Sequence, residues 1–277
     1  MTSILRRSEL PPLLRAIHDP PQRLYWRGAA EPGVLASNCV AIVGARACSP
    51  YGAQVARMLG RELAAGGVVV VSGLARGIDG EAHRGALEAR GHTVAVLGCG
   101  IDRDYPAAHA GLARSIAERS LLVSEYEPGV EPAPWRFPAR NRIIAGLCVA
   151  TIVVEARARS GALITADFAL EEGREVFAVP GEITSALSAG TNALLRLGAT
   201  PLSSAADVLE SLGLATAEPA PPAIPDRARS LLARLPATVD ELVRATGLPA
   251  GEIAAALAEL ELARLAAEGE GVYRGLA

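Results

Sequence analysis

Residues 137–165 read FPARNRIIAGLCVATIVVEARARSGALIT, and this stretch decides the fold. An apolar run, Val149–Val154, stands near its centre, with a helix start on either side. Nearly continuous apolar runs of this length are typical of strands that are buried on both faces. The stretch therefore predicts a strand between two helices of an α/β protein.

Five more short apolar runs have the same character, and segments with helical spacing lie between them. The six runs are 40–43, 68–71, 93–97, 121–123, 149–154 and 176–179, and the helical segments include 52–65, 80–89, 107–119 and 161–172. Strands that alternate with helices imply right-handed crossovers and a doubly wound, mostly parallel sheet. In such sheets ligands bind beyond the carboxyl ends of the strands.

The chain divides into four segments by composition. Residues 1–38 are proline-rich and are interpreted as a short lead-in segment, residues 39–212 form the α/β domain, and residues 213–225 form a Pro/Ala linker. Residues 226–277 offer three helical patterns and a terminal hairpin, which predicts a small winged-helix-like domain. This domain has eight acidic residues and six arginines, a balance that favours protein contact or regulation over a groove-reading role.

Composition narrows the class of protein. The 277 residues carry a formal net charge of −3, and all 27 basic residues are arginine. The net charge argues against a protein that coats nucleic acid with its whole surface, whereas a local basic patch is compatible with it. The four cysteines show no metal-binding or disulfide spacing, and no apolar run has the length of a membrane span. We expect a cytoplasmic protein without a metal or a cofactor.

Basic and polar side chains crowd the two helix starts around the strand at 149–154. They are Arg140, Asn141, Arg142, Arg157, Arg159, Ser160 and Thr165. Helix N-termini attract anions, and arginine can grip a phosphate with two parallel hydrogen bonds. The set predicts a phosphate-binding pocket, although any one of these arginines could simply be a solvated helix-start residue.

The turn after the first run contributes Gly44 and Arg46, and it lacks the G-x-G-x-x-G spacing of a dinucleotide site. A nicotinamide-dependent dehydrogenase is therefore disfavoured. Gly44 would allow close backbone approach, and Arg46 would contact phosphate. Phe137 is the best candidate to stack on a base, although it could equally fill the core beneath its loop.

Acidic and histidine side chains raise a hydrolase hypothesis. Asp79, Glu81 and His83 could act as acid–base groups, but an aspartate before a helix is more often an N-cap. Glu125 and Glu155 end strands at the same edge, where we expect them to order arginines rather than to catalyse. The remaining histidines, which include His109, are expected at the surface.

Seven ordered blocks of this sequence together resemble the DNA-processing protein A family (DprA, also called Smf). The blocks are AIVGAR at 41–46, VSGLARGID at 71–79, VLGCGID at 96–102, LVSEY at 122–126, FPARNRIIAG at 137–146, SGALITA at 160–166 and GREVFAVPG at 173–181. The resemblance extends from about Leu10 to Thr200, which is most of the chain.

The resemblance implies an extended Rossmann-like domain that binds single-stranded DNA without catalysis. It also implies a homodimer that protects incoming strands and loads the recombinase RecA in natural transformation. Carried over by motif, the DNA contacts would come from Gly44, Arg46, Ser124, Phe137, Arg140, Asn141, Ser160 and Thr165, to which the helix-start argument adds Arg142 and Gly161. Replacing Arg46 or Arg140 by alanine should weaken binding and leave the fold intact.

Two other functions stay open on sequence alone. A phosphoribohydrolase-like enzyme has a related architecture, and Glu155 with Arg140 could play its catalytic parts. The chain lacks the Gly-Gly-rich phosphate loop of such enzymes at Ser160 and Gly161. A regulatory module for a small nucleotide would instead bind mononucleotides and be indifferent to oligonucleotide length.

Overall fold

The computed structural model describes residues 2–214, 225–263, 265–269 and 271–275. They divide into two compact units, one on each side of residue 216. Positions 215–224, which make up most of the predicted linker, lie outside the described residues.

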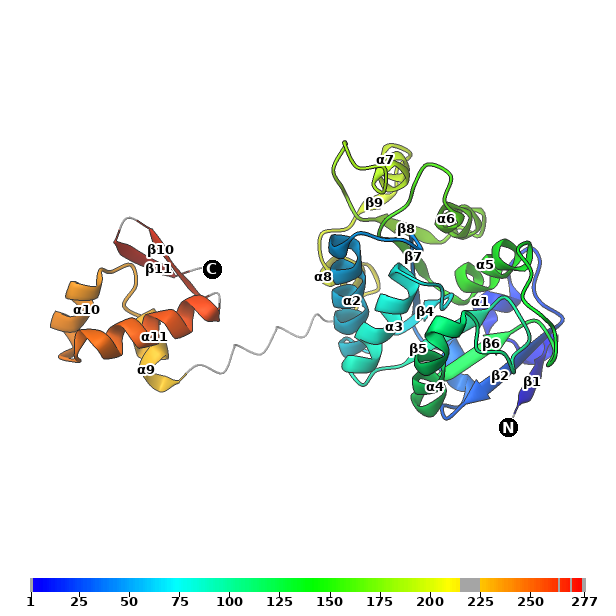
Figure 1. Cartoon of the computed structure of the whole chain (residues 1–277), viewed down its shortest axis with the longest axis horizontal. Coiled ribbons are helices and arrows are strands. Elements are labelled where there is room, and N and C mark those ends of the chain that lie inside the picture. Colours follow the sequence, from blue (N-terminus) through cyan, green and yellow to red (C-terminus); the bar gives the residue numbers. More distant parts are fainter. Residues whose placement is uncertain (1, 215–224, 264, 270, 276–277) are drawn as a thin grey trace. The chain divides into compact units, whose positions relative to one another are not determined.

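The first unit is built on a nine-stranded sheet with the strand order β1-β2-β6-β5-β4-β3-β7-β8-β9 (Figure 1). The strands are β1 (Ser3–Arg6), β2 (Arg23–Gly28), β3 (Cys39–Val43), β4 (Val69–Ser72), β5 (Thr93–Leu97), β6 (Leu121–Ser124), β7 (Ala150–Val153), β8 (Glu175–Ala178) and β9 (Thr200–Pro201). All neighbouring strands from β6 to β9 run parallel, whereas β2 pairs antiparallel with both β1 and β6. The predicted doubly wound, mostly parallel sheet is confirmed.

The N-terminal segment is part of this sheet. Sequence analysis assigned no strand to residues 1–38, whereas β1 and β2 extend the sheet beyond β6 and Leu14 and Leu24 are fully buried in the main core. The apolar pattern of these two strands is interrupted by Arg6 in β1 and by Arg23 and Arg27 in β2. In addition, β1 has only four residues. Antiparallel strands at a sheet edge can expose one face, so they lack the continuous apolar run that marks the central strands.

Helices cover both faces of the sheet. They are α1 (Pro12–Arg15), α2 (Pro50–Ala65), α3 (Ile78–Glu88), α4 (Ala110–Arg119), α5 (Arg136–Leu147), α6 (Gly161–Glu171), α7 (Ala189–Arg196) and α8 (Ala205–Ser211), with short 3-10 turns at Arg7–Glu9, Pro32–Ala36 and Ala107–His109. Alternate residues of a strand point to opposite faces. Along β3, Ala41 and Val43 therefore pack in the core beneath α1, α5 and α6, whereas Val40 and Ile42 pack beneath α2, α3 and α8.

The order of the strands reverses between β3 and β7. From β3 the chain proceeds through β4 and β5 to β6, and it then crosses back to place β7 on the other side of β3. The last residues of the two strands, Val43 and Val153, are paired in register. A crevice opens at such a reversal because the two following loops turn to opposite faces of the sheet.

Helices α2 and α3 approach each other closely through glycines. A Cβ atom on Gly60 would lie 2.3 Å from the carbonyl oxygen of Ala82, and one on Gly85 would lie 2.0 Å from that of Arg57. We expect Gly60→Ala to lower the free energy of unfolding by about 2 kcal/mol, because backbone must move to admit the methyl group. Urea denaturation measures this, with Gly111→Ala as control.

Gly111 is exposed in α4, and an added Cβ there would meet no atom within 4 Å. Alanine favours the helical backbone over glycine, so Gly111→Ala should be neutral or stabilise by up to ~1 kcal/mol. Equal stability changes in the two variants would contradict the close contact between α2 and α3.

The His83 imidazole is fully buried on α3, where its Nδ1 lies 2.7 Å from the Thr93 hydroxyl. Burial lowers the pKa of His83 from 6.5 to about 3. As the pH falls below 6.5, the unfolded chain takes up a proton on this imidazole that the folded chain does not take up. The free energy of unfolding therefore decreases. From this group we expect a loss of about 2 kcal/mol between pH 7 and pH 5.

The variant His83→Leu should lose this part of the pH dependence, and urea denaturation of both proteins at the two pH values measures it. Parallel loss of stability in wild type and variant would show that His83 is not its source.

The second unit is a three-helix domain with a terminal hairpin. Its elements are α9 (Asp226–Leu232), α10 (Val239–Thr246), α11 (Ala250–Leu262), β10 (Ala266–Gly269) and β11 (Val272–Gly275). Thr238 and Glu241 form a capping box at the start of α10, and Gly247 ends that helix with a left-handed backbone. Leu231, Leu242 and Leu257 are fully buried at its centre. The predicted winged-helix-like architecture is confirmed.

Candidate nucleic-acid interface

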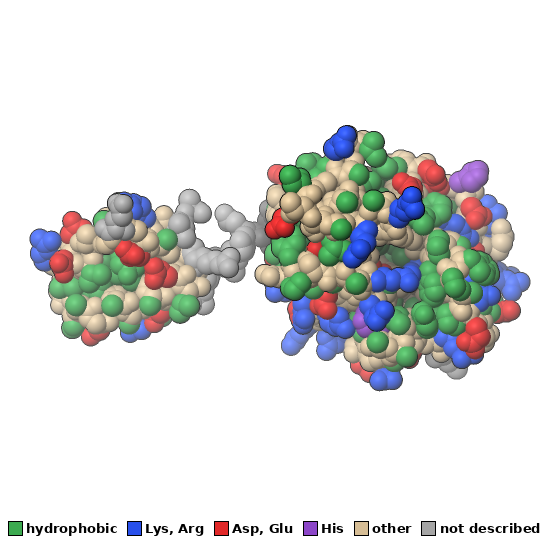
Figure 2. All heavy atoms as spheres, turned by 45° about the horizontal axis from the view of Figure 1, so that its top comes forward, with side chains coloured by type: hydrophobic (Ala, Val, Ile, Leu, Met, Phe, Trp, Pro, Cys, Tyr) green, Lys and Arg blue, Asp and Glu red, His purple; other side chains and the backbone are tan. Residues whose placement is uncertain are grey.

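A pocket of about 360 Å³ opens at the carboxyl ends of β3 and β7, where the strand order reverses. Its walls come from the loop after β3, the approach to α3, the first turns of α5, and the loop that leads into α6. Figure 2 shows arginine side chains gathered around a hollow on this face of the first unit. A concave site with basic walls fits a ligand that carries phosphates.

The loop after β3 supplies Arg46. Gly44 sits so close to its surroundings that a Cβ would lie 2.6 Å from the Ile78 side chain, and the N–H of Ala45 donates to the Glu155 carbonyl at 2.7 Å. The loop is thereby fixed, while Arg46 itself is exposed. Its guanidinium carbon lies 5.4 Å from the centroid of the Phe137 ring, in a cation–π arrangement.

Phe137 is half-buried in the pocket wall. Its ring stacks on that of Tyr105, with centroids 5.5 Å apart and planes 22° apart, and it packs against Gly98. The ring thus packs against Tyr105 and Gly98, and it also faces the pocket beside Arg46.

Arg140 forms the floor of the pocket and is only 4% exposed. Its guanidinium donates to the carbonyl of Gly73 at 3.0 Å and to that of Val96, which ties α5 to the ends of β4 and β5. Burial lowers the pKa of Arg140 to about 10, and the nearby Asp79 carboxylate opposes this shift. Arg140 is therefore a structural element of the pocket as well as part of its lining.

The Asp79 carboxylate does not cap the helix as the sequence analysis expected. Helix α3 starts at Ile78 after Gly77, and Asp79 turns back to accept hydrogen bonds from the N–H groups of Gly73 at 3.1 Å and Ala75 at 3.3 Å. Burial raises the pKa of Asp79, while Arg140 acts in the opposite direction. Both charged groups lie against Gly73, whose absent side chain leaves room for them.

The start of α6 closes the pocket. The Ser160 hydroxyl accepts from the N–H of Ala162 at 3.3 Å, and the Asn141 side chain donates to the Gly161 carbonyl at 3.1 Å, which links α5 to α6. Thr165 lines the wall one turn further along. The positive end of the α6 dipole points toward the pocket and favours an anion there.

The structure brings eight of the ten predicted contact residues to this pocket. They are Gly44, Arg46, Phe137, Arg140, Asn141, Ser160, Gly161 and Thr165. The other two lie elsewhere. The Ser124 hydroxyl is fully buried and donates to the Cys99 carbonyl at 2.6 Å. Arg142 points away from the pocket lining and pairs with Asp19 at 2.8 Å and Glu125 at 2.6 Å.

Two pocket arginines were quoted in the sequence but left out of the predicted contact set. Arg157 and Arg159 are exposed and line the pocket between β7 and α6. Their position between a strand end and a helix start is the signal that could have included them. The stacking of Tyr105 on Phe137 was also missed, because nothing local in the sequence joins the loop of Tyr105 to the start of α5.

The carboxylates do not form the catalytic sets considered above. Glu155 was expected to order arginines, but its carboxylate accepts from the Ser49 N–H at 2.9 Å and the Ser49 hydroxyl at 2.5 Å. The carboxylate thus holds Ser49, the N-cap residue of α2, and it is not in the pocket lining. The Glu81 carboxylate pairs with Arg84, and His83 bonds to Thr93, so Asp79, Glu81 and His83 do not converge.

His109, which was expected at the surface, is buried, with Nδ1 3.0 Å from the Leu74 carbonyl oxygen. Within the described ranges, no three His, Cys, Asp or Glu side chains are grouped as metal ligands would be, and no helix is long and apolar enough to cross a membrane.

The sequence of this chain is similar to those of named DNA processing proteins. The DNA processing protein DprA of Streptococcus pneumoniae is 48% identical over 200 residues, which cover 71% of this chain and 68% of the relative. Protein Smf of Escherichia coli is 43% identical over an alignment of 278 positions, which covers 95% of this chain and 74% of the relative.

Solved structures of DNA processing proteins are similar to this chain in fold as well as in sequence. The X-ray structure of S. pneumoniae DprA has a TM-score of 0.72 at 45% identity, covering 75% of this chain and 73% of that one. DNA processing protein A from Helicobacter pylori, whose structure describes its unique mode of binding single-stranded DNA, has a TM-score of 0.70 at 33% identity, covering 76% and 95%. Residues 2–213 match the family of DNA recombination-mediator protein A, and residues 213–271 match the DprA winged helix domain. The chain therefore belongs to the DprA/Smf family of DNA recombination-mediator proteins.

Proposed function

We propose that this chain binds single-stranded DNA in the pocket at the ends of β3 and β7, and that it does so without chemical turnover. The observation that carries the proposal is the pairing of Arg46 with Phe137, whose guanidinium carbon and ring centroid are 5.4 Å apart. Sequence-independent recognition of single strands combines cationic groups for phosphates with an aromatic face for a base. Both lie side by side here.

The remaining walls suit the sugar–phosphate backbone. Arg157 and Arg159 are exposed beside the start of α6, whose dipole adds to their attraction for phosphate. The net charge of −3 does not oppose this, because association depends on the local field, and four arginines line the pocket with Asp79 as the one acidic residue that the structure describes in the lining. The single-strand binding described for the H. pylori relative supports the same assignment.

In the cell we propose that the chain acts as a homodimer that protects incoming single-stranded DNA and loads RecA onto it during natural transformation. The family description as a recombination mediator supports this role. The test is RecA filament formation on single-stranded DNA covered by a single-strand-binding protein. Faster filament growth with the chain present is expected, and an unchanged growth rate would contradict the loading role.

An assay for nucleotide cleavage tests the enzymatic alternative. The geometry does not favour a phosphoribohydrolase, because Glu155 is held by Ser49 and is separated from the Arg140 side of the pocket. We expect no release of base from nucleoside monophosphates after prolonged incubation. Turnover that disappears in an Asp79→Asn variant would overturn the proposal, since Asp79 is the carboxylate in the pocket lining.

A further inference from the structure

A second aromatic cluster lies next to the pocket, and none of the roles above uses it. Trp135 is the residue that precedes α5, and 63% of its surface is exposed. The Arg136 guanidinium carbon lies 4.9 Å from the Trp135 ring centroid and 5.1 Å from that of Tyr126. The two rings meet edge to face, with centroids 6.5 Å apart. We call Tyr126, Trp135 and Arg136 the Trp135 cluster.

An exposed indole of this kind is unusual, because tryptophan is highly buried on average. Trp135 is outside the hydrophobic cores of the first unit. Its neighbours Arg136 and Tyr126 fix the ring rather than cover it, since they leave most of its surface accessible. An ordered, accessible π face next to a cation is what stacking on a nucleobase requires.

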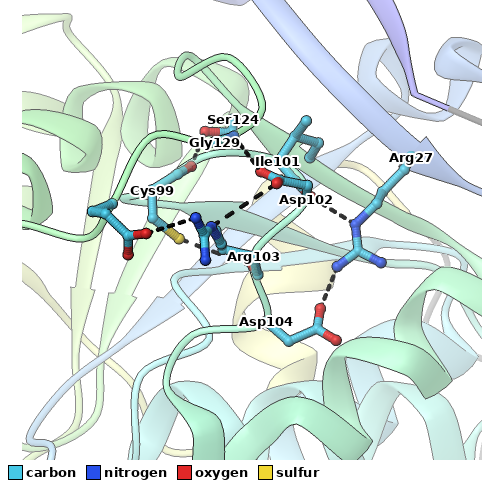
Figure 3. Close-up of polar contacts among 9 residues, drawn as sticks. Arg27, Cys99, Ile101, Asp102, Arg103, Asp104, Ser124 and Gly129 are labelled. Carbon is cyan, nitrogen blue, oxygen red and sulfur yellow. Dashed lines mark hydrogen bonds and ion pairs between the residues drawn. The ribbon is translucent and has the colours of Figure 1, made fainter.

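The loop that carries the cluster is held rigidly. Its Gly129 N–H donates to the Asp102 carboxylate at 2.9 Å, and Glu131 pairs with Arg103 at 2.6 Å. Figure 3 shows how the loop at 99–104 is anchored in turn, with Arg27 of β2 reaching Ile101 and Asp104. The Arg136 side chain also donates to the Glu131 carbonyl. A surface fixed before binding loses little conformational entropy when a ligand arrives.

The cluster adjoins the pocket at the start of α5, because Trp135 precedes this helix and Phe137, which lines the pocket, lies in its first turn. Trp135 and Phe137 are two residues apart, so their Cα atoms are within about 7 Å of each other. The loop at 99–104 that holds the cluster continues to Tyr105, which stacks on Phe137. Two of the acidic residues nearby are compensated, since Glu125 pairs with Arg142 and Glu131 with Arg103, and Glu127 of the same loop is exposed. A DNA strand that leaves the pocket past Phe137 and passes around the start of α5 would therefore meet the Trp135 indole.

We propose that Trp135, supported by Arg136 and Tyr126, is a second base-stacking platform for the same single strand, taking a nucleobase further along the strand than the one on Phe137. This inference rests on the proposed function of the pocket. It assigns Trp135 to DNA contact, and it makes the binding footprint longer than the pocket alone.

The test measures the affinity of the full chain for a labelled oligothymidylate by fluorescence anisotropy. Trp135→Ala should weaken binding roughly tenfold, because it removes the stacking of one base. Trp135→Phe, which keeps an aromatic face, should restore most of the affinity. Trp26→Phe is the matched control, because it alters the other tryptophan, on β2, and should leave the affinity unchanged.

Abasic sites at successive positions of the oligonucleotide separate stacking from a structural effect. One abasic position should weaken binding by the wild type and cost nothing further in Trp135→Ala, because the stacking partner is already lost. If the wild type binds but Trp135→Ala binds equally well, or if every abasic position costs the same in both proteins, the platform is wrong and the pocket stands. If the wild type does not bind single strands at all, the proposed function fails and the platform with it.

Discussion

Replacing Arg140 by alanine is expected to lower the free energy of unfolding by about 4 kcal/mol. The guanidinium is buried and donates to the carbonyls of Gly73 and Val96, and its removal leaves those acceptors and the Asp79 carboxylate without a buried cation. Removing one partner of a buried charged pair is costly because the other charge stays desolvated. Urea denaturation of the full chain measures the change.

Two variants show whether the buried charge is the cause. Asp79→Asn in the Arg140→Ala background should recover about 1–2 kcal/mol, because an amide has no net charge to desolvate. Arg159→Ala removes an exposed arginine of the same pocket and should change stability by less than about 0.5 kcal/mol. An Arg140→Ala variant as stable as Arg159→Ala would contradict the structural role of Arg140.

This expectation corrects the one drawn from sequence, in which Arg140→Ala weakens binding and leaves the fold intact. A loss of DNA binding in Arg140→Ala cannot be separated from the loss of the pocket floor. The exposed arginines are the better probes of contact, since their substitution leaves the packing of the pocket unchanged.

Replacing Arg46 and Arg157 together by alanine is expected to weaken single-strand binding roughly 100-fold, which corresponds to about 3 kcal/mol. Each side chain is exposed at the pocket mouth and is placed to contact a phosphate, and Arg46 also supports the Phe137 face. Anisotropy at one fixed salt concentration measures the change, and thermal unfolding checks that the variant is folded.

Arg61→Ala with Arg114→Ala is the matched control. Both side chains are exposed, on α2 and α4, and neither lines the pocket, so the double variant changes the net charge equally. We expect its affinity to remain within about twofold of wild type, because distant charges are screened at physiological salt. Equal losses in the two double variants would show that binding depends on total charge and not on the pocket.

The central sheet could be predicted from the sequence because its strands are buried on both faces. The runs at 40–43 and 149–154 correspond to β3 and β7 within one residue at each end, and the reversal between them places the pocket. The strand β2 was missed for the opposite reason. It lies toward the sheet edge, and its Arg23 and Arg27 break the apolar pattern that identifies the central strands.

The sequence predicted which residues gather at the site, but it did not predict which partner each side chain binds. Arg46 belongs to the loop after β3 and Phe137 to the first turn of α5, and the fold brings them together at the strand ends. The partners of Arg140 and Glu155 are far away in sequence, at Val96 and Ser49, and no local pattern records them. Ser124 and Arg142 carry suitable groups, but the Cys99 carbonyl and two carboxylates already engage them.

The most direct test of the pocket is the salt dependence of binding to single-stranded and duplex oligonucleotides by the wild type and by the Arg46→Ala/Arg157→Ala variant. We predict that the wild type prefers single strands and loses affinity steeply with added salt. The variant should have a slope of log affinity against log salt that is shallower by about 1.4, since each phosphate contact on a single strand contributes about 0.7. Equal affinity for single strands and duplex, together with an unchanged slope in the variant, would contradict the assignment of the pocket to single-stranded DNA.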